Sequence, residues 1–399
     1  MKGTAPRGRT LEEDERQARW LQTSNKNQAE NIMIVDMVRN DLGRIAMPDT
    51  VEVSDLWHLE KYPSLFQLTS TVKSRTQASL EDIFAALFPC ASVTGAPKVR
   101  SMEIIRELEQ GPRGAYTGAI GLIGPGRRAR FNVGIRTVDI DTVAGKATYG
   151  TGSGVVWDSV AREEWRECFT KALVLRPPPP EFQLLETILW DPEQGFVLLE
   201  RHLRRLEESA AYFGFPCDPP EVTRELDQAS RNLPRQPHRI RLLVSNQGTV
   251  RVESAPLEPH KKPWRLAVAA EPVDSANPFL FHKTTCRQVY RDHRKRFPGH
   301  DDVLLWNEQG EITESTLANV VVLRQQRWVT PPVDCGLLAG TFRAELLAQG
   351  RIEEETVELQ DLTSLESVYL INSVRQWIDT ELDITSSVPP AETRPSETP

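Results

Sequence analysis

Helical spacing of apolar residues is the main pattern in the first part of the chain. Residues 25–42 are dense in apolar positions and stop at Gly43, a residue type that commonly follows the last turn of a helix. A further helix is predicted over residues 97–110, where apolar side chains recur on one side, and a last one over about residues 161–175.

Strand patterns occur in both halves of the chain. Between residues 116 and 156, short β-rich runs are broken by glycine, and residues 131–140 alternate between apolar and polar. The second half begins with a β-like run over residues 182–190, followed by an amphipathic helix. Further strand signals lie at residues 240–245, 264–269, 302–306, 320–323 and 367–371. Helices and strands mix along both halves, so the predicted fold class is α+β.

Four consecutive prolines divide the chain. Residues 176–181 read Arg-Pro-Pro-Pro-Pro-Glu, which cannot continue a helix or a central strand and favours a stiff extended linker. The predicted modules are therefore residues 1–175 and 182–385. Residues 386–399 are rich in Pro, Ser, Thr and Glu, which predicts a disordered tail.

Composition narrows the class of protein. The 399 residues are 39% hydrophobic with a net charge of −8, which suits a globular protein and argues against nucleic acid or an anionic membrane as the main partner. No apolar run is long enough to cross a bilayer, so a cytoplasmic location is expected. The five cysteines are dispersed without a CxxC pair, so a structural zinc site is not expected.

Three glutamates in the first module are candidates for a metal site. Glu164 and Glu167 are three residues apart on a predicted helix, so both project from one face, and Glu30 lies on the earlier helix. Carboxylates that converge on one point need a hard cation such as Mg²⁺ between them. The alternative from spacing alone is a solvated acidic face.

Two glycine-rich turns and one arginine are candidates for anion binding in the same module. The turns are residues 92–98 and 150–154, and the first opens a predicted helix whose N-terminus favours negative charge. Arg136, in the alternating strand, can pair with a carboxylate through two hydrogen bonds. Each of these signals is weak by itself.

Taken in order, these segments resemble the chorismate-binding family, which includes anthranilate, aminodeoxychorismate, isochorismate and salicylate synthases. The matching segments are residues 30–44, 92–98, 113–121, 131–137 and 152–159, followed by Glu164 and Glu167. The resemblance implies the C-terminal part of an α/β sandwich, with the three glutamates around Mg²⁺. It implies substrate contacts from Thr94, Tyr116, Arg136, Gly152 and Gly154.

The first eight residues, MKGTAPRG, bear on the reaction. By resemblance, anthranilate synthases usually carry alanine where Lys2 stands, whereas aminodeoxychorismate synthases carry lysine as a nucleophile on the chorismate ring. Desolvation near a cation would favour the neutral, nucleophilic form of that lysine. The family domain begins well over a hundred residues before this motif, so the sequence is expected to be truncated, with impaired synthase activity and exposed apolar faces.

A lysine and a distant acid stand out in the second module. Lys283 closes a loop that contains proline and asparagine, and Glu314 follows 31 residues later. Pyridoxal 5′-phosphate needs a lysine for its Schiff base and a carboxylate at its ring nitrogen. The alternative is that Lys283 is one exposed lysine among many.

The wider second module resembles the class IV aminotransferases, a family that includes branched-chain and D-amino-acid aminotransferases and aminodeoxychorismate lyase. The matching segments are residues 202–210, 281–287, 310–319, 336–343 and 370–374. The resemblance implies a domain of two subdomains that binds pyridoxal 5′-phosphate. It assigns the phosphate to Arg205, the amides of Thr341 and Phe342, and Ser373, and assigns catalysis to Lys283.

The fusion of the two modules implies 4-aminobenzoate synthesis. The first step would aminate chorismate to aminodeoxychorismate, and the second would remove pyruvate. The resemblance further implies a separate glutamine amidotransferase and a homodimer formed through the second module. Two alternatives stay open: an amino-acid aminotransferase with a vestigial first module, and a first module that only docks the amidotransferase or forms a dimer surface.

Overall fold

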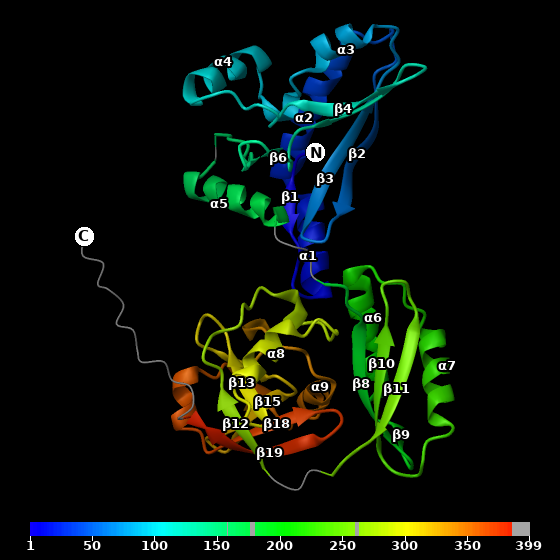
Figure 1. The fold of residues 1–399 in the computed structure, drawn as a ribbon, viewed down its shortest axis with the longest axis vertical. Helices are drawn as coiled ribbons and strands as arrows, with labels where there is room; N and C mark the ends of the chain where they lie inside the picture. Colours follow the sequence, from blue (N-terminus) through cyan, green and yellow to red (C-terminus); the bar gives the residue numbers. More distant parts are fainter. Residues whose placement is uncertain (158, 176–179, 260–262, 385–399) are drawn as a thin grey trace, which may run out of the picture. The chain divides into compact units, whose positions relative to one another are not determined.

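The computed structural model describes residues 1–157, 159–175, 180–259 and 263–384 (Figure 1). It divides into two compact units. The first comprises Met1–Arg7 and Glu15–Pro178, and the second comprises Gly8–Asp14 and Pro179–Pro399. The chain thus passes between the units not only at the proline run but also at both ends of Gly8–Asp14, which the sequence had placed in the first module. Most of the predicted linker and all of the predicted tail lie outside the described residues.

The elements of residues 1–175 alternate between helices and short antiparallel strands. They are β1 (Thr4–Pro6), α1 (Leu11–Thr23), α2 (Asn25–Gly43), β2 (Glu52–Lys61), β3 (Leu65–Lys73), α3 (Leu80–Leu87), α4 (Lys98–Leu108), β4 (Ala119–Gly124), β5 (Arg128–Val133), β6 (Val138–Asp141), β7 (Lys146–Tyr149) and α5 (Ala161–Ala172).

A three-stranded sheet in the order β1-β3-β2 forms the centre of the first unit. Its small core contains Ala5, Leu21, Phe66 and Leu68. Ser24 caps α2 by accepting a hydrogen bond from the Asn27 amide, which fixes where this helix begins. The other strands form two separate hairpins, β4-β5 and β6-β7.

Large apolar side chains are exposed across the first unit. The helix predicted over residues 97–110 forms as α4, but none of its residues is buried, and Leu108 is 77% exposed. Leu122 on β4 and Ile140 on β6 are 82% and 64% exposed. Among the described residues, every exposed large apolar side chain except Leu317 belongs to residues 1–175. The apolar faces expected from the sequence are therefore present, and they are exposed in this structure.

The second unit contains two sheets. Its elements are β8 (Leu184–Asp191), β9 (Gly195–Phe196), α6 (Leu199–Phe213), α7 (Pro219–Ser230), β10 (His238–Val244), β11 (Val250–Pro256), β12 (Trp264–Val268), α8 (Gln288–Lys295), β13 (Asp302–Trp306), β14 (Ile312–Ser315), β15 (Asn319–Arg324), β16 (Arg327–Thr330), α9 (Thr341–Ala348), β17 (Glu353–Glu354), β18 (Ser367–Asn372) and β19 (Gln376–Asp383).

The smaller sheet has the order β11-β10-β8-β9 and packs one face against α6 and α7. Strand alternation places Leu184, Ile188 and Ile240 on that face, and all three are fully buried. Leu206 of α6 and Leu226 of α7 fill the same core. This subdomain follows directly from the amphipathic pattern of its sequence.

The larger sheet has the order β14-β13-β12-β19-β18-β15-β16-β17. An additional pairing of β14 with β15 closes six of these strands into a barrel. Its interior is apolar, with Leu266, Leu304, Val320 and Leu370 almost fully buried. Two subdomains and a mixed α+β fold are therefore confirmed for the second module.

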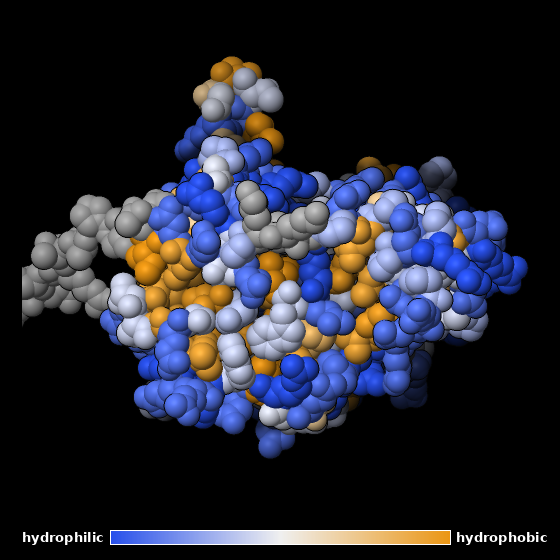
Figure 2. Space-filling model, turned by 90° about the horizontal axis from the view of Figure 1, so that it is seen from below, coloured by the Kyte–Doolittle hydropathy of each residue, from blue (hydrophilic) through white to orange (hydrophobic). Residues whose placement is uncertain are grey.

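The surface of the chain is largely polar on the face drawn in Figure 2, where hydrophilic residues surround smaller hydrophobic areas. None of the described helices combines the length and the apolar character that a membrane span requires.

Candidate active sites

Lys283 lies in the loop between β12 and α8, and this loop is tied to the smaller sheet. The Leu185 amide donates to the Lys283 carbonyl at 3.0 Å, and Thr284 forms a β-bridge with Leu184. Burial, together with the positive charges of Arg205 and Arg287, lowers the pKa of the Lys283 ammonium to about 8. Lys283 is therefore partly neutral near physiological pH, as a nucleophile or proton carrier must be.

Glu314 is buried on β14, opposite Asn319 of β15. The Tyr290 hydroxyl donates to Glu314 Oε1 at 2.7 Å, and Asn319 Nδ2 donates to Oε2 at 3.3 Å. Burial raises the pKa of Glu314 to about 7, although the hydrogen bond from Tyr290 opposes that rise. A carboxyl of this pKa is suited to accept a hydrogen bond from a protonated ring nitrogen.

Arg205 belongs to a buried charge network on α6. Its Nε and Nη2 donate to the two Glu186 oxygens at 2.9 and 2.6 Å, and its Nη1 donates to the Ala339 carbonyl at 3.0 Å. Burial alone would raise the pKa of Glu186, but the charge of Arg205 and the hydrogen bonds from His202 and Arg205 lower it to about 2. Arg205 is thus held in one orientation by two parallel charge-assisted hydrogen bonds.

His202 extends this network to the start of α9. Its Nδ1 lies 2.6 Å from Glu186 Oε2, and its Nε2 lies 3.2 Å from Thr341 Oγ1. Burial lowers the pKa of His202, so the neutral ring is favoured. A neutral ring that donates from Nδ1 to the carboxylate accepts at Nε2 from the Thr341 hydroxyl.

The start of α9 forms an anion cradle with its neighbours. Thr341 and Phe342 are the first two residues of α9, so their amides lack partners within the helix and favour negative charge. Gly340 must be glycine here, because an added Cβ would lie 1.8 Å from Asn319 Oδ1. Ser373 follows β18, and its hydroxyl donates to the Thr187 carbonyl of β8 at 3.2 Å.

These residues fit pyridoxal 5′-phosphate, the cofactor that a class IV aminotransferase fold implies. Arg205 and the free amides of α9 suit its phosphate, Lys283 suits its aldehyde, and Glu314 suits its ring nitrogen. The charges of Arg205 and Glu314 both act on Lys283, so the three groups share one electrostatic environment. The individual roles of these residues stay predictions.

In the first unit, two of the predicted site residues, Glu30 and Gly154, lie close to a third, Lys2. Lys2 Nζ lies 3.2 Å from Glu30 Oε2. A Cβ added to Gly154 would lie 2.4 Å from the same Nζ, so the Gly154 backbone passes close to the end of the Lys2 side chain. The Asn31 amide donates to the Lys2 carbonyl at 3.0 Å and helps to hold the residue in place.

The three glutamates predicted to bind Mg²⁺ each make their shortest contact with a different group, although the charges of Lys2 and Lys171 also act on Glu164. Glu30 pairs with Lys2, and Glu167 pairs with Lys171 at 2.6 Å. Glu164 accepts from Ser159 Oγ at 2.7 Å, which lowers its pKa. Within the part of the chain that the structure describes, no group of three or more His, Cys, Asp or Glu is placed to hold a metal ion. The Mg²⁺ site therefore stays a prediction.

The structure brings some of the predicted substrate-binding residues of the first unit together but not others. Tyr116 lies beside the glycine-rich turn, because a Cβ at Gly152 would be 3.0 Å from its hydroxyl. Thr94 instead turns its hydroxyl back to the carbonyls of Cys90 and Ala91. Arg136 is exposed, with a positive φ of 52°. The structure thus groups Tyr116, Gly152, Gly154 and Lys2, but gives Thr94 and Arg136 no shared partner with them.

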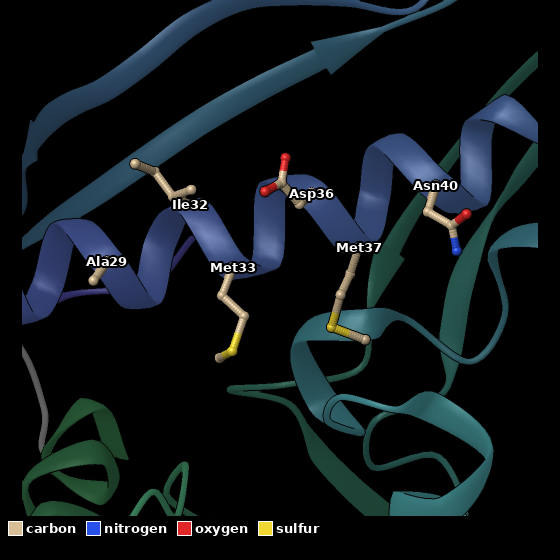
Figure 3. A pocket seen from close by; sticks show the side chains of 6 residues that line it. All are labelled: Ala29, Ile32, Met33, Asp36, Met37 and Asn40. Atoms are coloured by element: carbon tan, nitrogen blue, oxygen red, sulfur yellow. The ribbon is translucent and has the colours of Figure 1, made fainter.

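A shallow hollow of about 690 Å³ follows α2 (Figure 3). Met33 and Met37 project from the same side of the helix, next to Ala29. The residues that line it do not include Lys2, Glu30 or Gly154.

The sequence interpretation missed four residues of the second site: Glu186, His202, Tyr290 and Asn319. One signal was available, because Glu186 stands between Leu184 and Ile188 on the inward side of an alternating strand. A carboxylate in such a position must have a buried partner. Tyr290 and Asn319 carry no comparable signal, because their contact with Glu314 depends on the tertiary fold.

The two units match two protein families. Residues 1–177 match the model described as chorismate binding enzyme, and residues 183–380 match the one described as amino-transferase class IV. The first part is 44% identical over 176 residues to aminodeoxychorismate synthase component 1 of Bacillus subtilis, covering 44% of this chain and 37% of that protein. It is 43% identical over 175 residues to anthranilate synthase component 1 1 of Haloarcula marismortui, covering 43% and 35%.

The chain spans little more than a third of the length of these two curated relatives. The second part is similar to a proposed amino-acid aminotransferase from Mesorhizobium loti, at 40% identity and a TM-score of 0.49, covering 51% of this chain and all of that one.

In the second unit, Lys283, Glu314 and Arg205 share one electrostatic environment, an arrangement expected of a cofactor-dependent enzyme. The chain carries a class IV aminotransferase domain in residues 183–380 and a chorismate-binding domain in residues 1–177.

Proposed function

We propose that the second unit is an aminodeoxychorismate lyase, which removes pyruvate from 4-amino-4-deoxychorismate to give 4-aminobenzoate. One observation carries this proposal: the class IV aminotransferase domain is on the same chain as a chorismate-binding domain. An aminodeoxychorismate synthase makes the substrate that such a lyase uses, so two consecutive reactions explain the fusion. An amino-acid aminotransferase would have no reason to be joined to a chorismate-binding domain.

The chemistry of the lyase step suits Lys283. When bound, pyridoxal 5′-phosphate takes up the electrons of the broken C–H bond. Lys283, with a pKa of about 8, removes the proton from the ring carbon that bears the amino group. The ring becomes aromatic as the C–O bond to the enolpyruvyl group breaks, and Lys283 returns a proton to that leaving group. Glu314 holds the ring nitrogen of the cofactor in its protonated form.

For the first unit, we infer a role in the amination of chorismate. The contact of Lys2 with Glu30 and with the Gly154 loop supports this assignment, because it holds the lysine beside a carboxylate and a glycine-rich turn. The proposal includes Mg²⁺ at Glu30, Glu164 and Glu167, a separate glutamine amidotransferase as nitrogen donor, and a homodimer through the second unit. Lys2→Ala should abolish any 4-aminobenzoate formed from chorismate and ammonia, but not that formed from aminodeoxychorismate.

The rival aminotransferase function is tested with amino acids as substrates. The protein loaded with pyridoxal 5′-phosphate is mixed with L-leucine or D-alanine, and the absorbance of the cofactor is followed. A lyase should leave the cofactor spectrum almost unchanged. Rapid, complete conversion of the cofactor to its amine form, reversed by a keto acid, would instead identify an aminotransferase.

A further inference from the structure

A second cavity lies in the second unit, outside the residues assigned to the cofactor. Its volume is about 330 Å³, and its lining residues are Arg239, Trp264, Arg294, Asp301, Leu317 and Arg375. Three arginines therefore line one small space. A chain with a net charge of −8 has many carboxylates available to neutralise them, so their arrangement calls for an explanation.

Among the described residues, none of the three arginines of this cavity forms an ion pair with a carboxylate, although the charge of Arg294 acts on the buried Asp302 and opposes the rise of its pKa. Arg294 Nη2 donates to the Asp301 carbonyl at 3.0 Å, and Arg375 Nη1 donates to the Glu258 carbonyl at 3.1 Å. These neutral acceptors fix the side chains without cancelling their charge. Throughout the described residues, no carboxylate lies within 4.0 Å of the guanidinium nitrogens of Arg239, Arg294 or Arg375.

Asp301, the acidic residue of the cavity, already accepts a hydrogen bond from the backbone. Asp301 Oδ2 accepts from the Arg265 amide at 2.9 Å, so this carboxylate is directed to the backbone. Three arginines against one aspartate leave a net charge of about +2 around the cavity. Guanidinium groups bind carboxylates well because their N–H groups match the two oxygens.

An apolar residue accompanies the charges. Leu317 is 42% exposed, and among the described residues from 180 to 384 it is the only large apolar side chain in the exposed class. The indole of Trp264, which is buried, forms another part of the lining. A ligand that uses this cavity fully would present both an apolar ring and negative charge.

The cavity is lined by chain segments that also carry candidate cofactor residues. Arg375 is two residues after Ser373, whose hydroxyl reaches the Thr187 carbonyl. Thr187 pairs with Arg241 on β10, and Arg239 lies two residues away on the same face. On the other side, Leu317 follows Thr316, whose carbonyl accepts a hydrogen bond from Arg287. Arg375 and Leu317 of the cavity thus belong to the same chain segments as Ser373 and Glu314 of the candidate cofactor site.

We propose that this cavity binds the carboxylates of a carbocyclic dicarboxylate substrate, with Arg239, Arg294 and Arg375 as the anion contacts and Leu317 against the ring. The identification of that substrate as aminodeoxychorismate rests on the function proposed above. The cavity would determine which substrate the site accepts. A branched-chain amino acid has one carboxylate, so it has no further carboxylate for the arginines of the cavity.

Binding of a stable dicarboxylate tests this proposal without turnover. Benzene-1,3-dicarboxylate and benzoate are titrated into the full chain loaded with pyridoxal 5′-phosphate, and their dissociation constants are measured by calorimetry. The dicarboxylate should bind at least about tenfold more tightly than benzoate. Arg239→Gln and Arg375→Gln should each remove most of that advantage, whereas Arg351→Gln, the same change at an exposed position outside the cavity, should keep it.

Turnover of aminodeoxychorismate then separates the two proposals. The Arg239→Gln and Arg375→Gln variants should raise KM about tenfold with a much smaller change in kcat. Unchanged KM in both variants, with an active wild type, would overturn the dicarboxylate cavity and leave the lyase intact. Selective dicarboxylate binding without any turnover would overturn the lyase and retain the cavity. Equal binding of both probes by wild type and variants would overturn the cavity.

Discussion

Lys283 combines burial with two neighbouring arginines, and this lowers its pKa from the ordinary 10.5 to about 8. The folded protein therefore releases the lysine proton over a lower pH range than the unfolded chain. The neutral amine is the form that attacks an aldehyde, so its population near neutral pH decides how readily the site captures its cofactor.

Capture of pyridoxal 5′-phosphate should consequently depend on pH. The rate should rise with pH and level off above about pH 8, as measured by absorbance after mixing with cofactor-free protein. Arg287→Gln removes a nearby positive charge, so the midpoint should move to higher pH. Arg351→Gln should leave it in place. A midpoint near the ordinary value of lysine in the wild type would contradict this account.

Glu186 should stabilise the fold in a pH-dependent manner. Its pKa is about 2 in the folded protein and 4.5 in the reference state, so its contribution is present above pH 4.5 and is lost as the pH falls through 2. Glu186→Gln should lower the free energy of unfolding by about 3 kcal/mol at pH 7, and the difference should narrow as urea titrations are repeated toward pH 3.

The exposed ion pair of Glu253 provides the control for this experiment. Glu253 pairs with Arg241 and Arg251 on the sheet surface, so Glu253→Gln should change stability by less than about 1 kcal/mol. Glu186→Gln should also weaken the binding of pyridoxal 5′-phosphate, because Arg205 loses its orienting partner. Equal effects of the two substitutions would show that the buried network is not important for stability.

At the residue scale, the sequence was sufficient to predict the side chains that would touch the cofactor. It was not sufficient to predict the side chains that orient them. Lys283 and Arg205 belong to short segments that can be matched by residue type and order. Glu186 and His202 act through Arg205 and Thr341, and such contacts between distant segments are set by packing. In the first unit, Glu167 pairs with Lys171 one turn away, a local alternative that spacing alone did not exclude.

At the scale of elements, the junction before α9 leaves the least room for an added side-chain atom. A Cβ on Gly340 would lie 1.8 Å from Asn319 Oδ1, and Asn319 also donates to Glu314. Gly340→Ala should therefore displace both the anion cradle and the partner of Glu314. We expect a loss of cofactor affinity of at least tenfold, measured by fluorescence titration.

Gly299→Ala is the matched control, because nothing lies within 4 Å of a Cβ added there. It should bind the cofactor as the wild type does. Cofactor affinity of Gly340→Ala equal to that of Gly299→Ala would contradict the close packing of this junction.

Elements with strong periodicity were predicted well, and those that depend on pairing were not. The helix predicted over residues 25–42 is Asn25–Gly43, and the strand signal at residues 302–306 is Asp302–Trp306. The hairpin of β2 and β3 was missed, because its alternation is irregular and its register shifts near Asp55. The barrel closure by β14 and β15 depends on long-range pairing, which a one-dimensional pattern does not contain.

At the scale of the whole molecule, the two units differ in how well they bury their apolar residues. The second has two well-filled cores, whereas the first exposes Leu122 and Ile140. Exposed apolar surface of this extent promotes association. Replacing both residues with serine should reduce binding of a hydrophobic dye and self-association in sedimentation experiments. Thr142→Ser, a neighbouring exposed change, should not, and equal behaviour of the two variants would contradict the exposure of these residues.

The most direct test of the central claim is the release of products from aminodeoxychorismate by the full chain loaded with pyridoxal 5′-phosphate. The account predicts equal amounts of 4-aminobenzoate and pyruvate over many turnovers without an added keto acid. It also predicts no release by Lys283→Ala. A wild type that holds its cofactor but releases neither product, or a Lys283→Ala variant that releases both at the same rate, would contradict it.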